Sequence, residues 1–198
     1  MRYPDAINKL INKLSELPSV GPKTAERYVF YLLKQSQEGL EELASSIKEL
    51  KEKTVICQDC RVIADASPCR IRNDSNREKT VLCLVENTQD LSAIEATNQF
   101  KGHYFVLGGL ISTIKEIGPE SLEFRRLLKK IETDKIEELI IALNFSLEGE
   151  TTALYLKRLL KDKIKISRLA KGLPAGSDLE YADELTLASA LKNRNELK

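Results

Sequence analysis

From residue 80 onward, short runs of apolar residues alternate with segments of helical spacing, and this alternation constrains the fold more than any other feature. Runs with the length and composition of buried strands occupy residues 81–85, 104–107, 138–143 and 164–169. Segments with apolar residues at helical spacing follow the first three runs, reaching Ala96 and covering 124–131 and 151–160. Because buried parallel strands read as continuous apolar runs joined by helices, this part is predicted to form an open α/β sheet.

The residues before position 54 have a different pattern of apolar positions, which predicts helices only. Apolar residues at positions 7, 10, 11, 14 and 17 recur at the spacing of one helix face, and Pro18 ends that helix. The sequence PSVGP then predicts a tight turn. Further helices are predicted over 24–33 and, after the break at Gly39, over 40–51. The fold class is therefore α+β and multidomain, with a helical N-terminal part and a tail from 178 to 191 that is again helical.

The turn and the helix after it have the form of a helix-hairpin-helix. Gly21 is expected to take backbone angles that are closed to residues with a side chain. The following helix would offer free N–H groups and its positive end to a phosphate, with Lys23 and Arg27 on one face beside it. Contacts of this kind bind DNA without reading its sequence. A purely structural αα-turn is the alternative, and Ser19 stands where many such hairpins carry a glycine.

Three of the four cysteines lie in a segment that is poor in large apolar residues. Cys57 and Cys60 form a C-x2-C pair and Cys69 follows after eight residues, which is three quarters of a four-cysteine zinc site. The position of the fourth ligand is occupied by Arg72. Two interpretations stay open: zinc held by three thiolates and an outside ligand, or a knuckle without metal that packing and Arg72 hydrogen bonds maintain. Cys83 is predicted to be a buried strand residue.

An acidic cluster is predicted where strands of the sheet end. The segment ALNFSLEGE resembles the D-x-D-x-E-G-E stretch of Toprim enzymes, but Asn144 and Ser146 replace the aspartates that hold magnesium there. The acidic residues that remain in this region are Glu86, Asp90, Glu148 and Glu150. Weak magnesium binding stays open, while phosphodiester chemistry is not expected. In the alternative interpretation, Glu148 and Glu150 only stabilise the start of the following helix.

Composition limits the class of protein without naming a function. The chain has 198 residues, of which 42% are hydrophobic and 31% charged, as in globular proteins that are neither disordered nor membrane-bound. No apolar run approaches the ~20 residues that span a bilayer, and the N-terminus has no signal-peptide pattern, so a cytoplasmic location is expected. A net charge of +1 does not by itself indicate nucleic-acid binding. Any DNA contact must therefore come from local geometry or from several copies of a weak site.

The hairpin, the knuckle and the Toprim-like part, in this order, resemble the RecR family of recombination mediators. The sequence segments that support the resemblance include LPSVGPKTAER, VLGGLISTIKEIGPE, LEGETTALYL and AKGLPAGSDLEYADELTLA. The resemblance covers the whole chain and divides it into four parts. Residues 1–53 are a helix-hairpin-helix region for DNA binding and oligomerisation, and residues 54–79 are a cysteine knuckle. Residues 80–172 are a Toprim-like domain, and residues 173–198 are a C-terminal oligomerisation segment.

The resemblance implies a DNA clamp without enzymatic turnover. Members form dimers and a ring-like tetramer, bind single- and double-stranded DNA, and act with RecO, in some lineages also with RecF, to load RecA. By position, Gly21, Lys23 and Arg27 would contact DNA, and Cys57, Cys60 and Cys69 would be the ligands of zinc. The four acidic residues above would form a partner surface. Two other functions stay open: a magnesium-dependent Toprim nuclease or phosphotransferase, and a pure protein adaptor for RecO.

Overall fold

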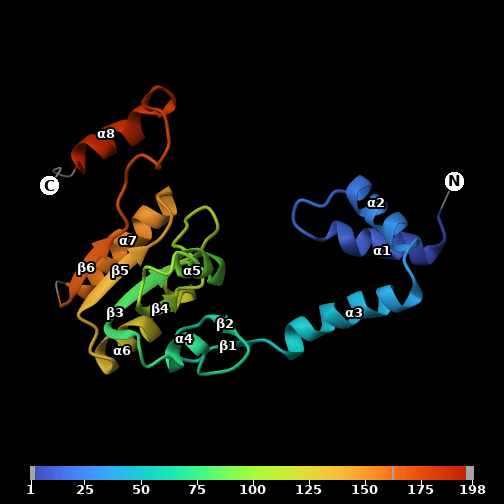
Figure 1. The fold of residues 1–198 in the computed structure, drawn as a ribbon, viewed down its shortest axis with the longest axis horizontal. Coiled ribbons are helices and arrows are strands. Elements are labelled where there is room, and N and C mark those ends of the chain that lie inside the picture. The colour runs from blue at the N-terminus through green and yellow to red at the C-terminus, as the bar shows by residue number, and fades with distance from the viewer. Residues whose placement is uncertain (1–2, 162, 195–198) are drawn as a thin grey trace. The chain divides into compact units, whose positions relative to one another are not determined.

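A computed structural model describes residues 3–161 and 163–194. The chain divides into two compact units, residues 1–54 and 55–198. The first unit is helical, and the second contains a parallel sheet with helices (Figure 1). The predicted fold class, a helical N-terminal part followed by an α/β domain, is confirmed.

The N-terminal unit is built from three helices. They are α1 (Asp5–Ser15), α2 (Pro22–Leu32) and α3 (Gln37–Glu52). The first two pack against each other, and Ala25 and Val29 of α2 are buried. Helix α3 begins before Gly39, where the sequence predicted a break, because the Ser36 hydroxyl accepts a hydrogen bond from the Gly39 N–H (3.2 Å) and caps the helix. A glycine costs little in the first turn of a capped helix.

The second unit contains a four-stranded parallel sheet and a two-stranded antiparallel one. The parallel sheet has the order β4-β3-β5-β6, with strands β3 (Glu78–Val85), β4 (Gly102–Val106), β5 (Glu138–Ala142) and β6 (Lys165–Arg168). The helices of this sheet are α5 (Thr88–Glu95), α6 (Phe124–Thr133) and α7 (Leu147–Leu160). The cysteine segment contributes β1 (Val55–Ile56), β2 (Ile63–Ala64) and the short helix α4 (Arg70–Asn73). All the strands predicted from apolar runs are present.

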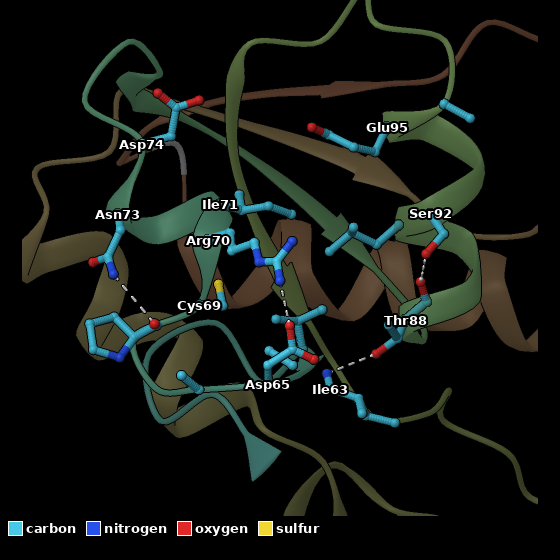
Figure 2. Close-up of a pocket in the computed structure, with 16 residues that line it drawn as sticks. Ile63, Asp65, Cys69, Arg70, Ile71, Asn73, Asp74, Thr88, Ser92 and Glu95 are labelled. Atoms are coloured by element: carbon cyan, nitrogen blue, oxygen red, sulfur yellow. Dashed lines mark hydrogen bonds and ion pairs between the residues drawn. The ribbon is translucent and has the colours of Figure 1, made fainter. Parts of the chain in front are cut away.

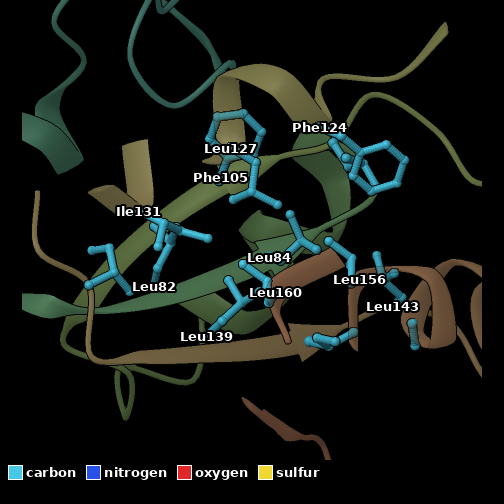
Figure 3. Packing of buried hydrophobic residues seen from close by; sticks show 14 residues of the cluster. Leu82, Leu84, Phe105, Phe124, Leu127, Ile131, Leu139, Leu143, Leu156 and Leu160 are labelled. Atoms are coloured by element: carbon cyan, nitrogen blue, oxygen red, sulfur yellow. The ribbon is translucent and has the colours of Figure 1, made fainter. Parts of the chain in front are cut away.

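Two clusters of buried side chains hold this unit together. In the first, leucines of β3 and β5 meet α6 and α7, and Figure 3 shows this packing around Leu84, Phe105 and Leu156. Removing each such side chain from water stabilises the fold by roughly 1.5–3 kcal/mol. The second cluster joins the knuckle cysteines to strand residues that include Cys83, which is buried as predicted. The knuckle therefore shares a core with the sheet.

Helix α7 begins earlier than its apolar periodicity indicates. The helix was predicted from position 151, but the Ser146 hydroxyl accepts a hydrogen bond from the Gly149 N–H (3.2 Å) and starts it at Leu147. A Cβ atom at Gly149 would overlap the backbone carbonyl oxygen of Asn144, so only glycine allows this close approach. The sequence L-E-G-E therefore forms the first turn of a helix.

The C-terminal tail is less regular than predicted. A 3-10 turn, η2 (Leu179–Tyr181), precedes helix α8 (Glu184–Lys192), and another 3-10 turn, η1 (Pro119–Ser121), lies before α6. Helix α8 starts anew because the Asp183 carboxylate accepts a hydrogen bond from the Thr186 N–H (2.9 Å). Residues 195–198 of the predicted C-terminal segment lie outside the described residues.

Candidate functional site

The hairpin turn between α1 and α2 uses a different residue for its special backbone angle than the sequence indicated. Ser19 has φ +63°, whereas Gly21 has φ −82° and ψ 168°, an extended conformation that any residue adopts. Open space surrounds the position where a Cβ of Gly21 would lie. The prediction that Gly21 takes angles closed to other residues is therefore wrong, and the left-handed residue stands where related hairpins carry their first glycine.

The start of α2 leaves backbone donors free for a ligand. Gly21 caps this helix without a side chain, and Pro22 at the first position has no N–H group. The first helical hydrogen bond runs from the Ala25 N–H to the Gly21 carbonyl (2.9 Å), so the N–H groups of residues 23 and 24 have no partner within the helix. The side chains of Lys23 and Arg27 are exposed on this helix, four positions apart. The arrangement can accept an anionic group.

An aromatic and basic patch on α2 and the turn after it continues from Arg27 and was missed by sequence reasoning. A hollow of about 560 Å³ is lined by Arg27, Tyr28, Phe30, Tyr31 and Lys34. Tyr31 is 64% exposed, which is unusual for a large ring in a structural helix face. Exposed rings beside cations are the combination on which single-stranded nucleic acid stacks. The helical spacing of Arg27, Tyr31 and Lys34 is the sequence signal that could have indicated this patch.

The three knuckle cysteines lie together, as their spacing suggests. Their sulfur atoms are within 4.8 Å of one another, and all three side chains are buried. The Sγ atoms of Cys60 and Cys69 are 3.3 Å apart. The hydrogen bond between these two thiols, together with burial, raises the pKa of Cys60, and the same hydrogen bond lowers the pKa of Cys69 to about 5. A cluster of this kind could hold a metal ion.

The knuckle lacks the fourth ligand of a structural zinc site. Among the described residues, the cysteines at 57, 60 and 69 are the only side chains in the cluster, whereas structural zinc takes four protein ligands. Arg72 pairs with Asp59 (2.6 Å) and with Asp134 (3.1 Å). The residues present therefore do not fit a four-ligand structural zinc site.

His103 is part of the surroundings of Arg72. It lies in β4 and is buried, and its Nδ1 is 3.1 Å from the Arg72 Nη1. Burial, together with the charges of Arg72 and Lys130, lowers the pKa of His103, so the neutral ring accepts a hydrogen bond from the guanidinium. Sequence reasoning missed this group of residues, because its members are far apart in the chain.

The acidic end of the sheet contains neutral groups where Toprim enzymes have aspartates. Glu86 follows β3, Asn144 follows β5, and the Asn144 amide donates a hydrogen bond to the Glu86 carboxylate (3.4 Å). The hydroxyl of Ser146 is occupied by its role as the cap of α7. Asp90 and Glu148 lie in the first turns of α5 and α7. Such positions stabilise helices by interaction with the positive end of the helix dipole.

Glu150 is paired with two cations instead of being a free acid. Its carboxylate accepts hydrogen bonds from Arg168 (2.6 Å) and Lys171 (2.6 Å), which lower the pKa of Glu150 to about 2. Both cations also lie over the ring of Phe145, at 4.6 Å and 4.5 Å from its centroid. Sequence reasoning missed both cations, because strand β6 brings Arg168 to Glu150 and the segment after that strand brings Lys171.

An open groove of about 960 Å³ lies between the knuckle and α5. Figure 2 shows Thr88 and Ser92 of α5 facing the knuckle residues Ile63 and Arg70 across this groove. The Ile63 N–H donates a hydrogen bond to the Thr88 hydroxyl (3.2 Å), which ties the knuckle to the helix. The groove thus marks the seam where the knuckle packs on the α/β domain.

Three stretches of the chain match known protein families. Residues 80–170 match the family described as "Toprim domain", residues 7–51 match "RecR, helix-hairpin-helix" and residues 172–195 match "RecR, C-terminal". Similar proteins named "Recombination protein RecR" come from Moorella thermoacetica (47% identity, 100% of both chains) and Myxococcus xanthus (46%, 98% of this chain and 99% of the relative). A third, from Staphylococcus aureus, is 42% identical over 100% of both chains. None of the helices described is long and apolar enough to cross a membrane.

Proposed function

The chain belongs to the RecR family of recombination proteins, and we propose that it works in recombinational DNA repair as a DNA-binding mediator without catalytic turnover. In this role it acts in the cytoplasm with RecO, and in some lineages with RecF, to load RecA onto gapped or single-stranded DNA. The acidic residues Glu86, Asp90, Glu148 and Glu150 belong to the surface that meets these partners.

The observation that carries the proposal is the geometry of α2. Its uncapped N-terminus follows Gly21, and the exposed cations Lys23 and Arg27 flank it. Free N–H groups and cations together bind phosphate, which supports DNA binding that is independent of sequence. The aromatic side chains of Tyr28 and Tyr31 extend the same surface, which favours single-stranded DNA as one of its ligands.

Exposed apolar side chains support self-assembly of the N-terminal unit. Leu43, Ile47 and Leu50 lie on one face of α3 and are 44%, 60% and 64% exposed. A row of this kind is buried when helices associate. We therefore expect the unit to bind a second copy, which leads to the dimers and the ring-like tetramer of the proposed clamp. A ring also compensates for a net charge of only +1, because several weak sites act together.

The acidic end of the sheet disfavours the magnesium-dependent nuclease as an alternative. Magnesium is bound through carboxylates and other hard oxygens, and in phosphoryl chemistry it is held by carboxylates aimed at one point. Here Asn144 and Ser146 are neutral and hydrogen-bonded, and Glu150 is paired with two cations. We propose that the domain serves as a scaffold and does not cleave DNA.

The experiment that tests the proposal is DNA affinity as a function of salt, measured on gapped DNA. The variants are Lys23→Ala/Arg27→Ala and a matched control, Lys9→Ala/Lys48→Ala, which removes the same charge from exposed positions of α1 and α3. The slope of log affinity against log salt corresponds to roughly 0.9 per phosphate neutralised on duplex. We expect the α2 variant to lose most of its affinity and to show a flatter slope, whereas the control keeps the wild-type slope.

Two outcomes contradict the assignment. Equal losses in both variants would mean that only net charge matters and that α2 is not the contact surface. Shallow or absent binding by the wild type would favour the pure adaptor, which meets DNA only through a partner protein. Circular dichroism of each variant shows whether the helices are intact, since Lys23 and Arg27 are exposed and their removal is not expected to unfold the unit.

A further inference from the structure

The position of the missing zinc ligand is the centre of an ion-pair network. Arg72 Nε is 2.6 Å from the Asp59 carboxylate, and its two terminal nitrogens meet the two oxygens of Asp134 at 3.1 Å and 3.2 Å. Lys130 Nζ lies 2.8 Å from Asp59 and 2.8 Å from Asp134. Two cations and two carboxylates thus alternate, and each charge has two partners of opposite sign.

We propose that this network closes the knuckle in place of a zinc ion. A structural zinc joins the two halves of a knuckle by taking ligands from each. Here Asp59 lies between Cys57 and Cys60 in the first half, and Arg72 lies three residues after Cys69 in the second. The pair between Asp59 and Arg72 therefore makes the connection that the metal would make.

The network also fixes the knuckle to the α/β domain, which a zinc ion bound by knuckle ligands alone would not do. Lys130 and Asp134 belong to the end of α6 and are 4% and 12% exposed. The contact between Arg72 and Asp134 is bidentate, a geometry that fixes the guanidinium and that lysine cannot reproduce. Buried charges that depend on one another in this way are costly to separate.

Other contacts provide what remains of the support. The Val106 N–H of β4 donates a hydrogen bond to the Cys60 carbonyl (2.9 Å), and Arg61 pairs with Glu123 (2.7 Å). The three cysteine side chains pack in the second buried cluster against strand residues. A metal-free knuckle therefore keeps both a core and a link between its halves.

Metal content is the first test, made on the full chain purified without chelators, exposed to zinc and then dialysed. We expect the wild type to hold well under one zinc per chain by elemental analysis. The variant Arg72→Cys completes the four-cysteine pattern and should hold about one zinc per chain. The matched control is Arg70→Cys in the same short helix. The Arg70 side chain is 93% exposed and points to Asp65 (Figure 2). This control should not gain zinc.

Thermal unfolding is the second test. Arg72→Ala leaves Asp59 and Asp134 with Lys130 as their shared counter-charge and removes the link between the two halves of the knuckle. We expect it to lower the Tm by about 10 °C, because the network includes two buried charges. Arg70→Ala breaks only an exposed pair and should change the Tm by less than about 2 °C. A zinc chelator should leave the wild-type Tm unchanged and lower that of Arg72→Cys.

Stoichiometric zinc in the wild type, with a Tm that falls on chelation, would overturn the proposal. So would an Arg72→Ala variant that is as stable as Arg70→Ala. If Arg72→Cys folds only in the presence of zinc, that dependence is the expected gain of a metal site. The zinc content of the wild type and the Tm of Arg72→Ala then test the proposal without a measurement on metal-free Arg72→Cys. None of these readouts involves DNA, so they are independent of the clamp function.

Discussion

The cysteine knuckle and the acidic end of the sheet are two regions that carry the pattern of a metal site with ligands missing. In both, an arginine pairs with carboxylates: Arg72 with Asp59 and Asp134, and Arg168 with Glu150. The arginine and its first carboxylate are similarly exposed in both: Arg72 and Asp59 are 28% and 35% exposed, and Arg168 and Glu150 are 25% and 37% exposed. The difference is that the knuckle network also contains two buried members, Lys130 and Asp134, which are 4% and 12% exposed.

This difference indicates that similar ion pairs make unequal contributions to the free energy of unfolding. A buried network is expensive to break, because a stranded charge cannot regain water, while an exposed pair is screened by solvent and salt. We therefore expect the knuckle network to be part of the stability of the α/β unit and the pair at Glu150 to be nearly neutral. Glu150 and Lys171 at the acidic end remain accessible to a partner, whereas Lys130 and Asp134 at the knuckle do not.

The largest effect is expected for Lys130→Ala. The substitution leaves Asp59 and Asp134 with Arg72 as their shared counter-charge and opens space at a buried position. We expect a loss of about 3–5 kcal/mol in the free energy of unfolding. Urea unfolding followed by circular dichroism measures it.

Lys165→Ala is the control for that prediction. Lys165 forms one ion pair with Glu138 and is 71% exposed, so its loss should change the unfolding free energy by at most about 1 kcal/mol. Similar losses in the two variants would show that burial does not distinguish the two kinds of pair, and the comparison between the two regions would then fail.

The sequence predicts the sheet well, but of the knuckle network it indicates only Arg72 and none of the partners of Arg72. Strand β3 is visible because its apolar run from Val81 to Val85 is local and continuous. The partners of the network are not local: 62 residues separate Arg72 from Asp134, and 71 separate Asp59 from Lys130. Periodicity and spacing carry no information on pairs of this separation.

Capping explains most of the errors in local structure. The starts of α3 and α7 were placed too late because the capping residues Ser36 and Ser146 precede the apolar periodicity that was used. At the hairpin, a glycine was taken as the sign of a left-handed residue, but Ser19 adopts that conformation instead. A residue type indicates which conformations are allowed, and the surrounding turn decides which one is used.

A second, smaller effect tests whether the acidic end can regain a metal. The variant Asn144→Asp/Ser146→Asp restores the two aspartates of the Toprim pattern, the first of them beside Glu86, so we expect weak magnesium binding that the wild type lacks. With a Kd of about 1 mM, 10 mM magnesium would stabilise the variant by roughly 1.4 kcal/mol. Thermal unfolding with and without magnesium chloride measures this gain.

Adding Glu86→Gln to the double variant is the control for the magnesium test. It should abolish most of the gain, because it removes the carboxylate that the two new ones would join. A wild-type protein stabilised by magnesium as strongly as the double variant would mean that the present residues already hold the ion, and the second region would no longer count as a lost metal site.

The smallest effect is expected for Glu150→Gln, and its pH dependence sharpens the comparison. The hydrogen bonds from Arg168 and Lys171 lower the pKa of Glu150 from 4.5 to about 2. A lowered carboxyl pKa contributes stability above the unfolded value of 4.5, and this contribution is lost as the pH falls from 4.5 toward 2. Because the group is more than a third exposed, the loss at pH 7 should be under about 1 kcal/mol and should shrink further in high salt. Urea unfolding of wild type and variant should therefore differ slightly at pH 7 and converge near pH 2. A difference that grows in acid would contradict the assignment of Glu150 as the partner of both cations, whereas convergence would show that Glu150 contributes through its ionised carboxylate.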